Sequence, residues 1–380
     1  MTDPVPILAN DPIFDRARPA PVDGIGLALS GGGYRAMLFH VGTLWRLLDS
    51  GKLGAVTRVS SVSGGSITAG VLALAWEAIE AGGLPAFRDR VVDPLRALAR
   101  VSIDERAILG GIVLPGSIAH YVARAYDRHL FDGATLQALP DTPRFVINAT
   151  NLETGALFRF SKRYMRDYRI GQVTNPTLPL SHAVAASSAF PPVLSPFVLD
   201  VAPDDFAPIA PDELADDAFR NEISLADGGV YDNLGLQQVW PQCKTVLVSD
   251  AGARLGFDPS PPGDWARQAL RVMEVIDHQV RNLRTSQMVG SIASKERSGA
   301  YWSIRSDIAI FPAPGALPCP PAQTARLAAT PTRLRRLDER HQERLINWGY
   351  AATDAAIRHW WDATIPPPQG FPYPNSGVGQ

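Results

Sequence analysis

Two consecutive units in the first quarter of the chain constrain its fold more than any other feature. In each unit a short apolar run, residues 25–29 and then 56–62, ends in a turn rich in serine and glycine. Each turn is followed by apolar residues at helical spacing, over residues 37–48 and then 66–81. Because this alternation of strand and helix is typical of α/β proteins, we predict a three-layer α/β/α fold with a largely parallel central sheet.

The rest of the chain carries further elements of both kinds. Residues 200–222 are acidic and rich in proline and alanine, which favours a surface loop, and the Pro191-Pro192 pair is expected to stop the helix before it. Strands are predicted at 145–149, 156–160, 223–226 and 245–249, and helices at 181–189, 265–284 and 332–361.

Composition excludes several classes of function. The 36 basic and 38 acidic side chains give a net charge of −2, so the chain has no bulk positive field for nucleic acid. Its 2 cysteines are too few for a disulfide framework or a cysteine-based zinc site. The longest apolar run, residues 67–76, is about half of what a membrane span needs. We therefore expect a soluble protein.

The second turn, Ser61-Val62-Ser63-Gly64-Gly65, is close to the G-x-S-x-G pattern of a nucleophile elbow. In such an elbow the serine occupies a strained turn between strand and helix, and small residues two positions to either side relieve crowding. Ser61 is small enough for the first of these places. The pattern makes Ser63 the candidate nucleophile, although a plain turn between a strand and a helix would look similar.

Two more glycine turns follow predicted strands. Gly31-Gly32-Gly33 precedes the first helix, where free backbone N–H groups can hold a phosphate or an oxyanion. Asp227-Gly228-Gly229 places a carboxylate beside two glycines, although an ordinary Asx turn has the same composition. Because open α/β sheets place their sites at the carboxyl ends of strands, the three turns together offer a nucleophile, an oxyanion cradle and a base.

This set of motifs resembles the patatin-like phospholipases. The resemblance covers Gly31-Gly32-Gly33-x-Arg35, Ser63 and Asp227-Gly228-Gly229, and two interior segments, 145–151 and 185–192, are also similar. It implies a lipid acyl hydrolase, a carboxylic ester hydrolase that uses a Ser-Asp dyad. Ser63 would be the nucleophile, Asp227 the base, and the amides around Gly31, Gly32 and Gly33 the oxyanion hole. We expect a lipid or lipid-like ester as substrate, with no cofactor and no metal.

Other assignments stay open at this stage. Arg35 could bind a lipid phosphate or form a structural salt bridge on the first turn of its helix. A triad of Ser63, Asp250 and His278 is the alternative catalytic arrangement, and a non-catalytic lipid-binding scaffold is the alternative to an enzyme. The apolar residues 108–118 are a candidate interfacial flap or a core helix.

The catalytic candidates lie far apart in the sequence yet must meet at one site, which favours one large domain. We predict an N-terminal arm over residues 1–23, a patatin-like α/β hydrolase domain over 24–364 and a flexible C-terminal tail over 365–380. No signal peptide is visible. The expectation is a cytoplasmic protein that contacts membranes peripherally, with secretion by another route left open.

Overall fold

The structure is a computed structural model that describes residues 20–104, 117–209 and 214–379. Over these residues the chain forms one mixed sheet of eleven strands. Its centre is parallel and has the order β11-β10-β1-β2-β3. These strands are β1 (Val22–Leu29), β2 (Val56–Val62), β3 (Arg144–Asn151), β10 (Cys243–Asp250) and β11 (Ser298–Ser303). The predicted parallel centre is confirmed.

Antiparallel strands extend the sheet beyond β3. One series continues in the order β4-β5-β6-β8, and a second branch joins β9 to β3 and β7 to β9. The sequence pattern predicted only two of these strands, because the others are very short and flanked by turns. They are β4 (Leu157–Phe160), β5 (Tyr164–Asp167), β6 (Gly171–Thr174), β7 (Phe197–Asp200), β8 (Phe206–Ala207) and β9 (Glu222–Asp227).

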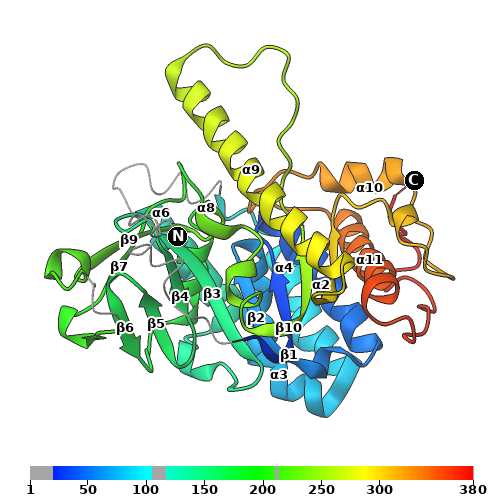
Figure 1. The fold of residues 1–380 in the computed structure, drawn as a ribbon, viewed down its shortest axis with the longest axis horizontal. Coiled ribbons are helices and arrows are strands. Elements are labelled where there is room, and N and C mark those ends of the chain that lie inside the picture. The colour runs from blue at the N-terminus through cyan, green and yellow to red at the C-terminus, as the bar shows by residue number, and fades with distance from the viewer. Residues whose placement is uncertain (1–19, 105–116, 210–213, 380) are drawn as a thin grey trace, which may run out of the picture.

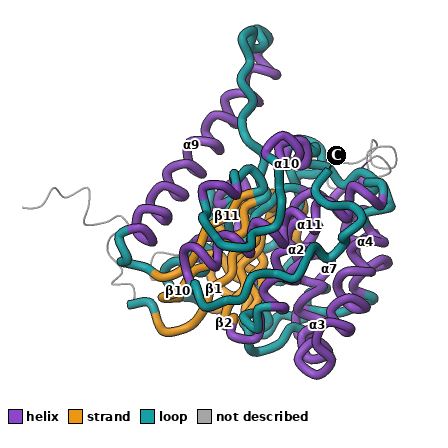
Figure 2. The backbone as a smooth tube through the Cα atoms, turned by 90° about the vertical axis from the view of Figure 1, so that its right-hand side faces the viewer, coloured by secondary structure: helices purple, strands orange, loops and turns teal. Residues whose placement is uncertain are grey.

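Helices cover both faces of the parallel centre (Figures 1 and 2). On one face, Leu27 and Leu29 of β1 join a large core with α2 (Gly33–Asp49), α3 (Gly64–Phe87) and α11 (Glu339–Ala356). On the other face, Ala28 packs with the carboxyl end of α9 (Trp265–Ala293) in a smaller core. The remaining helices are α4 (Asp93–Leu98), α6 (Ser117–Tyr126), α7 (Leu180–Ser187), α8 (Gly229–Asp232) and α10 (Pro321–Ala328).

Two glycines let the last long helix reach the centre of the molecule. At Gly42 of α2 an added Cβ would overlap the carbonyl of Ile346, and at Gly349 of α11 it would overlap the carbonyl of Phe39. The backbones of α2 and α11 therefore cross in direct contact, which only glycine permits. Residues after 300 are part of the main core and do not form a separate layer.

One helical stretch, Gly64–Leu98, is long and apolar enough to cross a membrane by length and composition alone. In the structure 56% of its most apolar window is buried inside the protein, where α3 packs on α2 and α7. We therefore assign α3 to the larger of the two hydrophobic cores, on the face of the sheet that α2 and α11 also cover.

The C-terminal segment, which was predicted as a flexible tail, has neither helix nor strand, as its prolines and glycines suggest. It lies against α11. The side-chain amide of Asn347 donates to the carbonyls of Tyr373 and Gly377, both at 2.8 Å, and Arg46 donates to the carbonyl of Pro366. Buried polar groups of the helices thus fix a segment that has no regular structure of its own.

Candidate active site

Ser63 occupies the sharp turn between β2 and α3. Its backbone has φ of +52° and ψ of −122°, a conformation that L-residues rarely adopt. The next two positions must be glycine, because a Cβ at Gly64 would overlap the Gly33 carbonyl and one at Gly65 would overlap the Leu29 carbonyl. The elbow geometry that the sequence indicated is present, and it is pressed against the end of β1 and the glycine loop.

A buried network of hydroxyl groups supports this strained turn. The hydroxyl of Ser187 on α7 accepts a hydrogen bond from the backbone N–H of Ser63 at 3.0 Å and donates to the carbonyl of Asn148 at 2.6 Å. Ser66 donates to Ser61 at 3.0 Å, so the unusual serine before the elbow is satisfied. Sequence reasoning missed the role of Ser187, although its segment was among those that resemble the family.

Asp227 ends β9, which runs antiparallel to β3. In the register along β3, Val62 of β2 pairs with Asn148, and Asp227 pairs with the next residue, Ala149. The carboxyl ends of β2 and β9 therefore meet along one edge of β3. The sequence analysis placed both residues at the carboxyl ends of strands, and in the structure these two strands run in opposite directions along β3.

Asp227 is only 2% exposed, and it lines the same cavity as Ser63, whose hydroxyl lies close enough to influence the pKa of the Asp227 carboxyl group. Burial raises the pKa of Asp227 to about 7, although the Gly229 N–H, which donates at 2.7 Å, and the Ser63 hydroxyl oppose this shift. The negative charge of Asp277 on α9 adds to the increase in the pKa. A carboxylate with this pKa accepts a proton near neutral pH far better than an exposed aspartate.

The glycine loop offers two free amides where the sequence suggested three. The Gly31 N–H donates to the carbonyl of Asn233 at 3.1 Å. Gly32 and Gly33 have φ of +145° and +60°, and in the part of the chain that the structure describes their amides donate no hydrogen bond. They lie at the beginning of α2, where the helix dipole favours negative charge.

Arg35 does not reach the site, which corrects the suggestion that it contacts substrate. Its side chain is buried, and its guanidinium donates to the carbonyl of Ala251 at 3.0 and 2.8 Å and to the carbonyl of Thr330. Burial lowers its pKa to about 10, and the nearby positive charge of Arg305 contributes. Arg35 ties the beginning of α2 to two loops, because a long side chain on the first turn can reach both.

We expect Arg35→Met to act on stability and leave substrate preference unchanged. Removing the donors leaves two buried carbonyls without partners, which costs about 1–3 kcal/mol of unfolding free energy. Thermal melting measures this loss. The ratio of kcat/KM for a phospholipid to that for an uncharged glyceride serves as the second readout. A selective fall for the phospholipid would restore the substrate-binding role.

The residues of the alternative triad are not joined to one another. His278 lies on α9, and its Nδ1 is 3.2 Å from the side-chain nitrogen of Asn282. The Asp250 carboxylate accepts from the Tyr301 hydroxyl at 2.9 Å and from the Gly252 N–H at 2.8 Å. Within the described ranges no hydrogen bond connects His278 to Ser63 or Asp250. Ser63 and Asp227 line one cavity.

A cavity of about 570 Å³ opens onto Ser63 and Asp227. Its walls come from the turn after α7, from α8, from the loop after β10 and from α9. Most of the wall is apolar, which suits an acyl chain. The apolar lining residues are Phe190, Pro191, Pro192, Val230, Leu234, Ala253, Leu255, Leu270, Met273, Ile276 and Val280.

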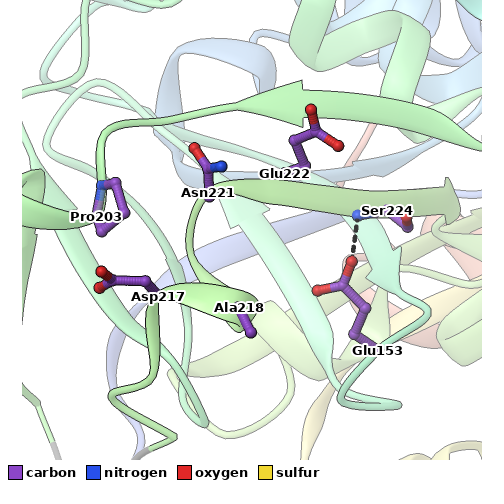
Figure 3. A pocket seen from close by; sticks show the side chains of 7 residues that line it. All are labelled: Glu153, Pro203, Asp217, Ala218, Asn221, Glu222 and Ser224. Atoms are coloured by element: carbon purple, nitrogen blue, oxygen red, sulfur yellow. Dashed lines mark hydrogen bonds between the residues drawn. The ribbon is translucent and has the colours of Figure 1, made fainter.

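A second hollow lies at the antiparallel side of the sheet and is acidic (Figure 3). Glu153, Asp217 and Glu222 line it, and Glu153 accepts a hydrogen bond from the backbone of Ser224 at 3.0 Å. Among the described residues, no three His, Cys, Asp or Glu side chains form a group that could hold a metal ion. The serine of this hollow, Ser224, lies within β9 and not at a strand-to-helix elbow, so the apolar cavity is the candidate active site. The proposed flap at 108–118 lies almost entirely outside the described residues.

Fold and site together define a class: α/β proteins with a serine at a strand-to-helix elbow, beside a buried carboxylate and a glycine loop. The family model for patatin-like phospholipase matches residues 27–240, and the chain belongs to this family. The family implies a lipid acyl hydrolase. No curated protein matches the sequence.

Solved structures of two other proteins are similar to this chain. Human GIVD cytosolic phospholipase A2 has a TM-score of 0.50 at 14% identity, over 88% of this chain and 59% of that one. VipD from Legionella pneumophila has a TM-score of 0.36 at 16% identity, over 87% of this chain and 66% of that one. This chain therefore spans less than two thirds of either protein, and at these identities the likeness to the human enzyme concerns the fold alone.

Proposed function

We propose that the protein hydrolyses carboxylic esters of lipids through a Ser63–Asp227 dyad and an acyl-enzyme intermediate. One observation carries the proposal: the elbow serine, Ser63, lines the same apolar cavity as the buried carboxyl group of Asp227, whose pKa burial raises to about 7. A fold without catalytic function would have no need of a buried carboxylate at this turn, because its desolvation is costly.

The first half of the reaction transfers the acyl group to the enzyme. Ser63 Oγ attacks the ester carbonyl carbon while its proton passes to Asp227. The amides of Gly32 and Gly33 donate to the resulting oxyanion, a contribution worth about 10²–10³ in rate for each such donor. When the tetrahedral intermediate collapses, the C–O bond breaks and Asp227 returns the proton to the departing alcohol.

In the second half of the reaction, water hydrolyses the acyl-enzyme. Asp227, now ionised, takes a proton from a water molecule that attacks the Ser63 ester. The second tetrahedral intermediate releases the fatty acid, and Ser63 recovers its proton from Asp227. The apolar cavity would hold the acyl chain during both steps. Phospholipids, lysophospholipids, neutral glycerides and simple esters all fit this chemistry.

Fluorophosphonate labelling followed by peptide mass spectrometry tests the proposal directly. We expect one adduct, on Ser63, and release of free fatty acid from mixed lipid vesicles. A lipid-by-lipid comparison of wild type with Ser63→Ala identifies the substrate class. If the pure, folded protein neither labels nor releases fatty acid, the scaffold alternative stands and the hydrolase is rejected.

The His278→Ala variant separates the dyad from the triad. We expect it to lose at most about fivefold in kcat/KM, because His278 lines the cavity without bonding to Ser63, whereas losing a general base costs about 10²–10⁴. Initial rates on a soluble ester provide the measurement. Complete loss of activity with an intact melting curve would assign the base to His278.

A further inference from the structure

An arm projects from the body beside the active site. It comprises the loop 251–264, which follows β10, and the first part of α9, residues 265–284 (Figures 1 and 2). Twenty helical residues span about 30 Å, so most of this segment extends beyond the rest of the molecule. Of all residues in α9, only Met288 and Ile292, at its carboxyl end, are buried.

The arm is amphipathic, but its polar side chains are the ones that make contacts within the protein. Arg271 donates to the carbonyl of Gly256 at 2.6 Å, and Arg281 donates to the carbonyl of Ala253. Arg284 pairs with the buried Asp232 of the body at 3.1 Å. These bonds hold the returning loop along the helix and fix the helix to α8.

The apolar side chains of the arm face water instead. Trp265, Val272, Ile276 and Leu283 recur at helical spacing on one stripe, and all four are exposed. Trp265 is 83% exposed, Leu283 is 68% exposed, and Phe257 in the middle of the loop is 99% exposed. An apolar stripe of this kind on a soluble body marks an interaction surface.

Three features indicate that the partner of this apolar stripe is a lipid surface. The stripe is continuous with the cavity, because Leu270, Met273 and Ile276 of the same helix line the way to Ser63. The exposed aromatic side chains Phe257 and Trp265 are of the kind that lie at membrane interfaces. Residues 251–284 carry five arginines and four acidic side chains, so apolar insertion and not charge would drive binding.

We propose that this arm inserts its apolar stripe into a membrane surface and passes lipid from there into the cavity. The passage of lipid into the cavity rests on the proposed lipid hydrolysis, but membrane binding by the arm can be measured without any turnover. The proposal places the membrane contact on α9 and the loop before it. The sequence had suggested a different segment, residues 108–118, as the candidate flap.

Vesicle flotation with phosphatidylcholine tests the arm. The variant Phe257→Ser/Trp265→Ser/Leu283→Ser changes three exposed side chains that do not line the cavity. We expect its partition coefficient to fall by about tenfold or more, since each side chain loses burial in lipid. Binding of the wild type in 1 M NaCl should be as strong as at low salt. Ile310→Ser, which changes a 62% exposed apolar residue outside residues 251–284, is the matched control and should float like wild type.

Three results would overturn the proposal: flotation of the triple variant like wild type, loss of wild-type binding in high salt, or no wild-type binding at all. Light scattering on the same samples measures the oligomeric state. If the wild type is a dimer, the triple variant is a monomer and both float equally well, the stripe binds a second copy of the chain instead of lipid. Melting curves confirm that the variants fold. Fluorophosphonate labelling of Ser63 is scored separately, so failure of labelling with intact flotation would reject the hydrolase and leave the arm supported.

Discussion

Ser63→Ala is expected to lower kcat/KM for ester hydrolysis by about 10⁴-fold or more and to remove fluorophosphonate labelling. The hydroxyl is the atom that forms the acyl-enzyme, and the remaining amides and cavity can contribute only residual rate enhancement. Stability should change little, because alanine can adopt the turn as well as serine can. Steady-state hydrolysis of a soluble ester, together with thermal melting, provides the measurement.

The neighbouring serines supply the control for this experiment. Ser61→Ala keeps a small residue at the position before the elbow and loses only the hydrogen bond from Ser66. Labelling should therefore persist in Ser61→Ala. If Ser63→Ala still carries a covalent adduct, the nucleophile lies elsewhere and the elbow serves only to join β2 to α3.

Asp227→Asn is expected to reduce kcat/KM by about 10³-fold or more and, at pH 8, to stabilise the fold. The amide cannot accept the serine proton, which removes general-base catalysis. It also removes a buried negative charge that burial disfavours. We expect a gain of about 2–4 kcal/mol in the free energy of unfolding at pH 8, on the scale of about 1.4 kcal/mol per pKa unit.

The pH dependence of both effects follows from the sign of the pKa shift. Because the pKa of Asp227 is raised to about 7 in the folded protein, the folded state binds a proton that the unfolded state has already released above about pH 4. Wild-type stability should therefore fall as pH rises from about 4 to 7. The activity of the wild type should rise through the same range and level off above pH 7, since Asp227 must be ionised to act as base.

Melting curves and initial rates between pH 4 and 8 test this pair of effects. The difference in melting temperature between wild type and Asp227→Asn should be largest at pH 8 and should become small near pH 4, where the Asp227 carboxyl group is largely protonated in the unfolded state as well as in the folded state. Asp217→Asn, at an exposed acidic residue outside the site, should match wild type in both measurements. A stability difference that is independent of pH would mean that Asp227 is not the titrating group.

The sequence predicted the first β-α-β-α units well, because each combines a continuous apolar run, a glycine turn and a helical period. The β2 strand has the predicted bounds, Val56–Val62. The glycines at 64 and 65 were informative because contact with the backbone of β1 and of the glycine loop dictates them. Where two backbone segments are in direct contact only glycine fits, so the glycine in the sequence indicates the contact.

Other features depend on distant partners, which local pattern cannot show. The antiparallel direction of β9 is set by its pairing with β3, and the burial of Arg35 is set by the loops at Ala251 and Thr330. The amphipathic pattern of 265–284 indicated a helix, but no pattern reveals which face a helix turns to water. The crossing of Gly42 and Gly349 joins segments too far apart in sequence to be paired by inspection.

Because β2 and β9 meet along β3, the distance between the two proposed catalytic residues depends on the register of these strands. Ser63 and Asp227 are held together because their strands end at adjacent residues of β3, Asn148 and Ala149. One residue inserted into β9 would displace its end by about 3.3 Å and turn its side chains to the opposite face. Such a change could spare the fold and still separate the pair, whereas the loops between these strands are free to vary in length. Changes in the length of these strands, more than changes in the loops, therefore limit how far the sequence can vary while the reaction is retained.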